Sequence, residues 1–135
     1  MQLPHGLVVA VVDGEILNLY SNTGDERQPK LSAFELGPID GDNKSSGARH
    51  SSSSANPDES RQEEDSFAAA VAAKLNQQAL AGAFESLFVI ATPKTLGELR
   101  KHYHKALEAK LLGELAKDLT GHSVADIEAA LAKAN

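Results

Sequence analysis

Two short apolar runs, far apart in the chain, constrain the fold more than any other feature of the sequence. Residues 7–12 read LVVAVV and residues 87–91 read LFVIA, and neither run contains a polar side chain. Strands of this composition are buried on both faces, as in the middle of a sheet that carries helices on each side. The two runs therefore predict two central strands of one α/β sheet.

The first run leads into an expected set of antiparallel strands. Asp13-Gly14 lies between two apolar segments, a pattern that favours a tight type I′ hairpin because both central positions need positive φ angles. The second strand is then expected over residues 15–20. Residues 30–36 (KLSAFEL) alternate well enough to form a third strand.

Helix signals surround the second apolar run. Ser60 and Glu63 form a capping box, and this box predicts a helix that runs to about Ala81. Thr92-Pro93 follows the second run directly. Because threonine is a good N-cap and proline suits the first helical position, a further helix is expected to begin there.

The segment 106–119 (ALEAKLLGELAKDL) fits two descriptions. Its residues have high helix propensity, but Gly113 interrupts it. Leu111, Gly113, Leu115 and Leu119 also fit one face of a strand. A last amphipathic helix is expected from Ser123 onward.

These elements occur in the order β-β-β-α-β-α-β-α when the segment 111–119 is a strand. Antiparallel strands followed by crossovers predict a ribonuclease H-like mixed sheet with helices packed on it. An all-helical C-terminal half is the alternative. We expect residues 1–135 to form a single domain with a long disordered loop at about 37–60, of which residues 41–60 are a flexible serine-rich stretch.

Composition narrows the function. Thirteen basic and nineteen acidic residues give a net charge of −6, so phosphate backbones and anionic membranes repel the chain as a whole, and DNA binding is not expected. The absence of cysteine excludes disulfides and thiolate chemistry. The start, MQLPHGLVVAVVDG, lacks both the positive region of a signal peptide and the length of a membrane span. A cytoplasmic protein is expected.

A series of short motifs resembles one bacterial family. In order they are LVVAVVDGEILNLY, SGARH, EEDSFAAAVAAKLN, GAFESLFVIATP, PKTLGELRKH and LAKDLT. They resemble the bacterial "protein required for attachment to host cells" (host attachment) family. That family is similar to the middle domain of archaeal and eukaryotic class-1 peptide-release factors and of related ribosome-rescue factors. The resemblance implies the ribonuclease H-like fold, supports a strand over residues 111–119, and suggests a link to translation.

One candidate site is the expected strand-to-helix turn at Thr92, Lys94 and Thr95. Ligands of open sheets tend to bind beyond the carboxyl ends of parallel strands, and a helix N-terminus attracts anions. Lys94 and Thr95 would add donors there. In the alternative reading, Thr92 only caps the helix and Gly97 lets that helix approach the sheet.

Two further groups are candidate partner-binding residues. Arg100, Lys101 and Lys105 are expected to form a basic strip on a helix, suited to salt-sensitive contact with RNA or protein. Arg49 and His50 belong to the serine-rich loop, where the resembling family usually has Gly-Arg-His. Here an alanine separates the glycine from that dipeptide, which weakens any role that depends on the glycine.

Signals for a reaction are weak. A ribonuclease H-type nuclease needs acidic side chains on central strands to hold two metal ions, and residues 7–12 have none. Release in the similar factors depends on a Gly-Gly-Gln loop, and this chain has no Gly-Gly pair. His102 and His104 are two residues apart, which on a helix places them on nearly opposite faces. Serines near His50 lack the rigid geometry of a catalytic triad. We expect neither a metal nor a cofactor.

The sequence thus favours a non-catalytic binding or adaptor protein of the host attachment family, with an unknown protein as its partner. One alternative is a translation-associated factor that contacts ribosomal RNA or the ribosome through Arg49, Arg100, Lys101 and Lys105. A second alternative is a hydrolase whose site forms where the serine-rich loop meets the turn at Thr92.

Overall fold

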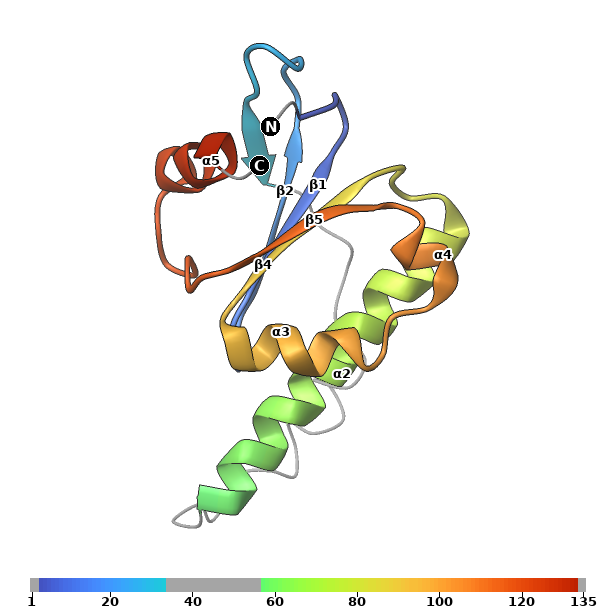
Figure 1. The fold of residues 1–135 in the computed structure, drawn as a ribbon, viewed down its shortest axis with the longest axis vertical. Helices are drawn as coiled ribbons and strands as arrows, with labels where there is room; N and C mark the ends of the chain where they lie inside the picture. Colours follow the sequence, from blue (N-terminus) through green and yellow to red (C-terminus); the bar gives the residue numbers. More distant parts are fainter. Residues whose placement is uncertain (1–2, 34–56, 134–135) are drawn as a thin grey trace.

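A computed structural model describes residues 3–33 and 57–133, with side chains of the first helix described from residue 64. In this part of the chain a five-stranded sheet carries helices on its two faces (Figure 1). Arg49 and His50 lie outside the described residues, as does most of the predicted serine-rich loop. None of the helices in these two ranges is long and apolar enough to cross a membrane.

The sheet has the strand order β3-β2-β1-β4-β5. Its strands are β1 (Val8–Val12), β2 (Leu17–Asn22), β3 (Leu31–Ala33), β4 (Leu87–Ala91) and β5 (Leu111–Ala116). Strand β2 is antiparallel to β1 and β3, whereas β1, β4 and β5 are parallel. The two apolar runs are therefore adjacent central strands, as predicted. The mixed sheet and the strand in the ambiguous segment are both confirmed.

Four helices accompany the sheet in the described residues: α2 (Pro57–Ala81), α3 (Pro93–Arg100), α4 (Lys105–Glu108) and α5 (Val124–Lys133). Helix α2 begins at Pro57 rather than at Ser60, because proline suits the first helical position. It ends as expected, with Gly82 at a φ of 76°. The short helix α4 was not predicted.

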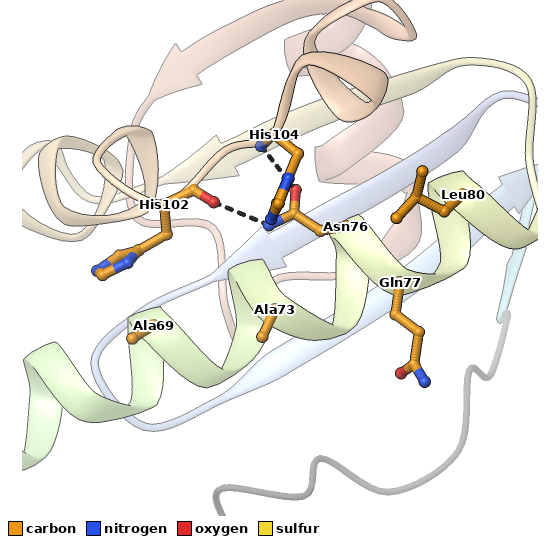
Figure 2. Close-up of a pocket in the computed structure, with 7 residues that line it drawn as sticks. All are labelled: Ala69, Ala73, Asn76, Gln77, Leu80, His102 and His104. Carbon is orange, nitrogen blue, oxygen red and sulfur yellow. Dashed lines mark hydrogen bonds between the residues drawn. The ribbon is translucent and has the colours of Figure 1, made fainter.

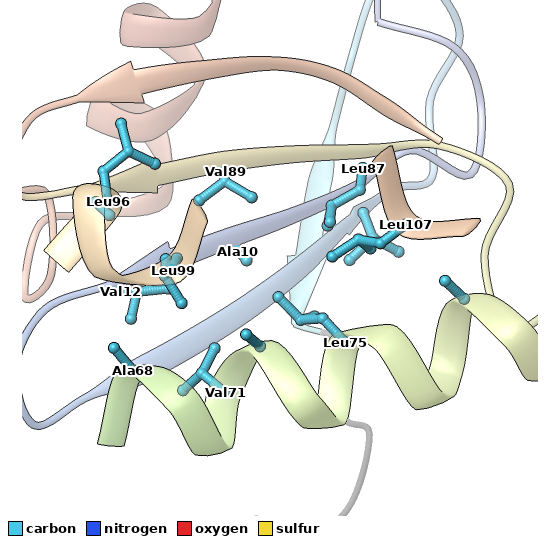
Figure 3. Close-up of a cluster of buried hydrophobic side chains, with 14 of the residues drawn as sticks. Ala10, Val12, Ala68, Val71, Leu75, Leu87, Val89, Leu96, Leu99 and Leu107 are labelled. Carbon is cyan, nitrogen blue, oxygen red and sulfur yellow. The ribbon is translucent and has the colours of Figure 1, made fainter. Parts of the chain in front are cut away.

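Each face of the sheet has its own hydrophobic cluster. Helices α2 and α3 cover one face, where Val71, Leu75 and Leu99 pack against side chains of β1 and β4 (Figure 3). Helix α5 covers the other face through Ile127 and Leu131. All residues of β1 and β4 are buried. Burial on both faces explains why neither strand has a polar side chain.

The β1–β2 connection differs from the predicted type I′ hairpin. Val12 pairs with Leu17, so residues 13–16 form a longer turn. The Asp13 carboxylate accepts hydrogen bonds from the N–H groups of Glu15 and Ile16, both at 2.7 Å. Because this side chain satisfies the turn's amides, Gly14 does not need the positive φ that Gly6, Gly82 and Gly121 have.

Strand β5 contains a bulge that the alternating pattern did not predict. Leu111 pairs with Leu87 and Gly113 with Phe88, which leaves Leu112 as an extra residue, 46% exposed. A bulge reverses the alternation of side chains. Leu111 and Leu115 consequently pack on opposite clusters, so the prediction that they share one face is wrong.

Candidate functional site

A pocket of about 410 Å³ lies between the outer face of α2 and the turn that joins α3 to α4. Its lining comprises Ala69, Ala73, Asn76, Gln77, Leu80, His102 and His104. Figure 2 shows Ala69 and Ala73 on the stretch of α2 next to the segment that carries the histidines, Leu80 further along the helix, and the Gln77 side chain pointing away from both histidines. The pocket therefore combines a small apolar floor with two imidazoles.

Asn76 builds one wall of this pocket by holding the α3–α4 turn. Its side chain is 6% exposed. The amide nitrogen donates to the His102 carbonyl at 2.8 Å, and the amide oxygen accepts from the His104 N–H at 3.0 Å (Figure 2). These bonds hold the main chain on both sides of Tyr103, which packs against the core beneath α3. His102 and His104 are thereby left to line the pocket.

His102 and His104 are both exposed, as expected of surface histidines, but the assumption that they lie on one helix is wrong. Helix α3 ends at Arg100, so both histidines lie on the turn beyond it and line the same pocket. The sequence did contain one signal for this arrangement. Asn76 is a poor helix former within the alanine-rich interior of α2, where a polar residue needs a partner when it is buried.

The predicted basic residues lie on the same segment, but two of them are paired with acids. Arg100 donates from Nε and Nη2 to Glu114 Oε1 at 3.0 and 2.8 Å. Lys101 Nζ lies 3.1 Å from Glu98 Oε1, and His102 Nε2 lies 3.2 Å from Glu98 Oε2. Hydrogen bonds from Lys101 and then His102 hold the pKa of Glu98 below its usual value.

Lys105, at the start of α4, is exposed next to His104. The three predicted basic residues therefore do not form a strip on one helix, because α3 ends at Arg100, Lys101 is its C-cap and Lys105 belongs to α4. Within residues 100–105 the cationic groups of Arg100 and Lys101 are balanced by carboxylates. The resulting surface is mixed in charge rather than strongly basic.

Tyr103, Glu114 and Arg100 form a half-buried polar cluster between α3 and β5. The Glu114 side chain is 17% exposed, and its Oε1 accepts both bonds from Arg100. Within the described part of the chain, Glu114 Oε2 and the Tyr103 hydroxyl are buried without a hydrogen-bond partner. Burial and, secondly, the charge of Glu114 raise the pKa of Tyr103 far above its ordinary value. The phenol thus stays protonated and serves as a neutral group beside the carboxylate.

The strand-to-helix turn brings Thr92, Lys94 and Thr95 together, as predicted. Thr92 is the N-cap of α3: its Oγ1 accepts from the Thr95 N–H at 3.4 Å and donates to the Thr95 hydroxyl at 2.9 Å. Lys94 Nζ lies 3.1 Å from Glu64 Oε1. Because these polar groups bond to one another and to Glu64, the cap itself accounts for them. An anion at this turn stays a prediction.

An acidic group that the sequence did not single out lies at the same edge of the sheet. The Thr120 hydroxyl lies 2.8 Å from Asp13 Oδ2 and 2.7 Å from Asp118 Oδ1. Partial burial acts to raise the pKa of Asp13. The hydrogen bonds from Glu15, Thr120 and Ile16 outweigh it and hold this pKa below its usual value.

Within residues 3–33 and 57–133, no three His, Cys, Asp or Glu side chains are placed to hold a metal ion.

The described residues thus define a mixed-sheet α/β protein with a pocket beside the α3–α4 turn. The model of the bacterial archaeo-eukaryotic release factor family 12 matches residues 7–131, so the chain belongs to this family. This membership confirms the relationship to release factors that the sequence motifs implied. The host attachment name is not part of this match. No curated protein matches the chain.

Proposed function

We propose that the protein is a translation-associated factor that contacts ribosomal RNA through the α3–α4 segment, residues 100–105. The observation that carries this proposal is the match of a release factor family over residues 7–131. It favours the translation-associated alternative of the sequence analysis over an adaptor of the host attachment family. Arg49 and His50 would extend the contact if the serine-rich loop takes part.

The exposure of the segment supports the same function. The side chains of Arg100 and Lys101 are 57% and 70% exposed, and Lys105 at the start of α4 is exposed as well. Ion pairs at such surfaces are worth only about 0–1 kcal/mol. A phosphate group can therefore replace Glu98 as the partner of Lys101 at little cost, and Glu98 keeps its contact with His102.

We infer a binding role without peptide release, carried out by residues 1–135 as one domain. Release in the similar factors depends on a Gly-Gly-Gln loop, and the sequence contains no Gly-Gly pair. A contact protein needs only a rigid platform. The sheet with α2 and α3 packed on it supplies such a platform for the segment.

Co-sedimentation with ribosomes at low salt tests this function. The triple variant Arg100→Glu, Lys101→Glu, Lys105→Glu should lose at least about tenfold in binding, because each lost phosphate contact weakens association and each new carboxylate repels. A matched control, Arg27→Glu, Lys30→Glu, Lys133→Glu, makes the same charge change at exposed positions of the β2–β3 turn and the end of α5.

The control should retain most of its binding. Equal losses in both triple variants would indicate a response to net charge alone, and this result would contradict a contact through the segment. Absence of ribosome binding by the unaltered protein at any salt concentration would overturn the function itself.

A further inference from the structure

The pocket beside the α3–α4 turn has a lining suited to a flat, polar-edged ring. We propose that it binds one unpaired base of RNA, inserted between α2 and the turn. This inference rests on the proposed ribosome contact and extends it, because it names the part of the RNA that is recognised. Proteins recognise RNA sequence mainly in single-stranded regions, where splayed bases stack on aromatic side chains such as histidine.

The lining residues suit the two faces of a base. Ala69 and Ala73 leave an apolar floor without bulky side chains, and the imidazoles of His102 and His104 supply surfaces for stacking (Figure 2). The Gln77 carboxamide points away from both histidines, so a base stacked on them keeps its polar edge toward solvent (Figure 2). The volume of about 410 Å³ falls within the range of small-molecule sites.

The backbone that carries the two histidines is held in place before any ligand arrives. Asn76 holds the backbone at His102 and His104 through two hydrogen bonds. Glu98 Oε2 lies 3.2 Å from His102 Nε2 and so orients that ring. Because a preformed site avoids the cost of ordering its groups on binding, even a single stacked base can contribute measurable affinity.

The charges at the rim favour RNA over an apolar protein segment. Lys101 and Lys105 flank the two histidines in the sequence, and both are exposed. The carboxylate of Glu98 is already bonded by Lys101 and His102, so its repulsion of phosphate is reduced. A base in the pocket would thus place its neighbouring phosphates near cations. An apolar helix would instead bury the imidazoles without new hydrogen-bond partners.

A pocket-filling substitution separates this inference from the ribosome contact. Ala73→Leu places a large side chain on the pocket floor without changing the charge, and leucine is a good helix former. Ala129→Leu makes the same change at an exposed position of α5 and is the control. Binding of fluorescein-labelled single-stranded oligouridylate and oligoadenylate is measured by anisotropy, with duplex RNA of equal length as a second probe.

Ala73→Leu should weaken binding of at least one single-stranded probe by about fivefold or more, the effect of one lost stacking contact. The Ala129→Leu variant should bind as the unaltered protein does. Duplex RNA should bind both variants equally, and equal unfolding midpoints show that neither change disturbs the fold. In the unaltered protein, single-stranded RNA should also shift the imidazole NMR signals of His102 and His104.

Three results would overturn the base site. One is that Ala73→Leu binds single-stranded RNA as tightly as the unaltered protein does, while the triple charge variant still loses ribosome binding. This result would leave the proposed function intact. Another is loss of ribosome binding in Ala73→Leu with no change for either oligonucleotide, which would assign the pocket to a ribosomal protein. The third is binding of neither ribosomes nor oligonucleotides by the unaltered protein, which removes both proposals.

Discussion

Gly113 shows how one residue determines the packing of an edge strand. A Cβ atom at this position would lie 2.8 Å from Cε2 of Phe88, closer than two carbon atoms can approach. Phe88 is 2% exposed, and its ring belongs to the cluster beneath α5. The glycine that appeared to interrupt a helix in the sequence therefore makes room for an aromatic ring against the sheet.

Replacing Gly113 with alanine should destabilise the fold. The added methyl group has to displace the buried Phe88 ring or the strand, and overpacking of this kind costs about 1–3 kcal/mol. Urea unfolding followed by circular dichroism measures the change in free energy. Gly97→Ala is the matched control, because no atom lies within 4 Å of its added Cβ. Since Gly97 lies within α3, the control should stabilise the protein by about 0.5–1 kcal/mol. Equal effects of the two variants would contradict the packing argument.

At the scale of elements, sequence patterns predicted best where a local signal determines the structure. The run 87–91 became β4 with the expected bounds, and Thr92 became the N-cap of α3. Strand β4 depends on the burial of a contiguous apolar run, and the start of α3 depends on a hydrogen bond between residues three positions apart. The end of α3 and the pocket histidines could not be predicted in the same way, because Asn76 holds them from 26 and 28 residues away.

Asn76→Ala should loosen the turn between α3 and α4. The substitution leaves the His102 carbonyl and the His104 N–H without their partner, and unsatisfied groups of this kind cost about 1–3 kcal/mol. The free energy of unfolding in urea should fall by that amount, and hydrogen exchange of the His104 amide should accelerate. Gln77→Ala, at the exposed neighbouring position, should change stability by less than about 0.5 kcal/mol. An unchanged exchange rate at His104 would show that the clamp does not hold the turn.

The cluster between α3 and β5 predicts a loss of stability at alkaline pH. The folded state raises the pKa of Tyr103 above its ordinary value of 10.0, because burial and the Glu114 carboxylate favour the neutral phenol. The unfolded chain therefore loses this proton first, and stability falls as the pH rises above about 10. Thermal unfolding at several pH values between neutral and strongly alkaline measures the slope.

Tyr103→Phe should reduce the alkaline slope, since phenylalanine has no proton to lose. Tyr20→Phe retains Tyr103 and should retain the loss of stability that Tyr103 causes. If the slope were the same in unaltered protein and in Tyr103→Phe, the buried phenol would not be its source.

At the scale of the whole molecule, charge sets the conditions for binding. The chain carries a net charge of −6, so its approach to a ribosome depends on the local cations of residues 100–105 rather than on the overall field. The amino-acid composition predicted that the whole chain repels phosphate backbones. It could not predict which Lys and Arg side chains form ion pairs with carboxylates. Arg100 meets Glu114 only because the fold places α3 beside β5. Lys101 meets Glu98 because they lie three residues apart at the end of α3.

The proposed contact predicts a modest dependence on salt. If Arg100, Lys101 and Lys105 each neutralise one phosphate of single-stranded RNA, the logarithm of the binding constant should fall with the logarithm of salt concentration with a slope of about −2. Replacing the three residues with glutamine should bring this slope close to zero. The control Arg27→Gln, Lys30→Gln, Lys133→Gln removes the same charge elsewhere and should keep the slope near its original value.

Anisotropy titrations of oligouridylate over a fourfold range of salt measure both slopes, and the affinity of the unaltered protein should fall roughly ten- to twentyfold over this range. If the slope persisted after the first set of substitutions, the phosphates would be bound elsewhere on the molecule.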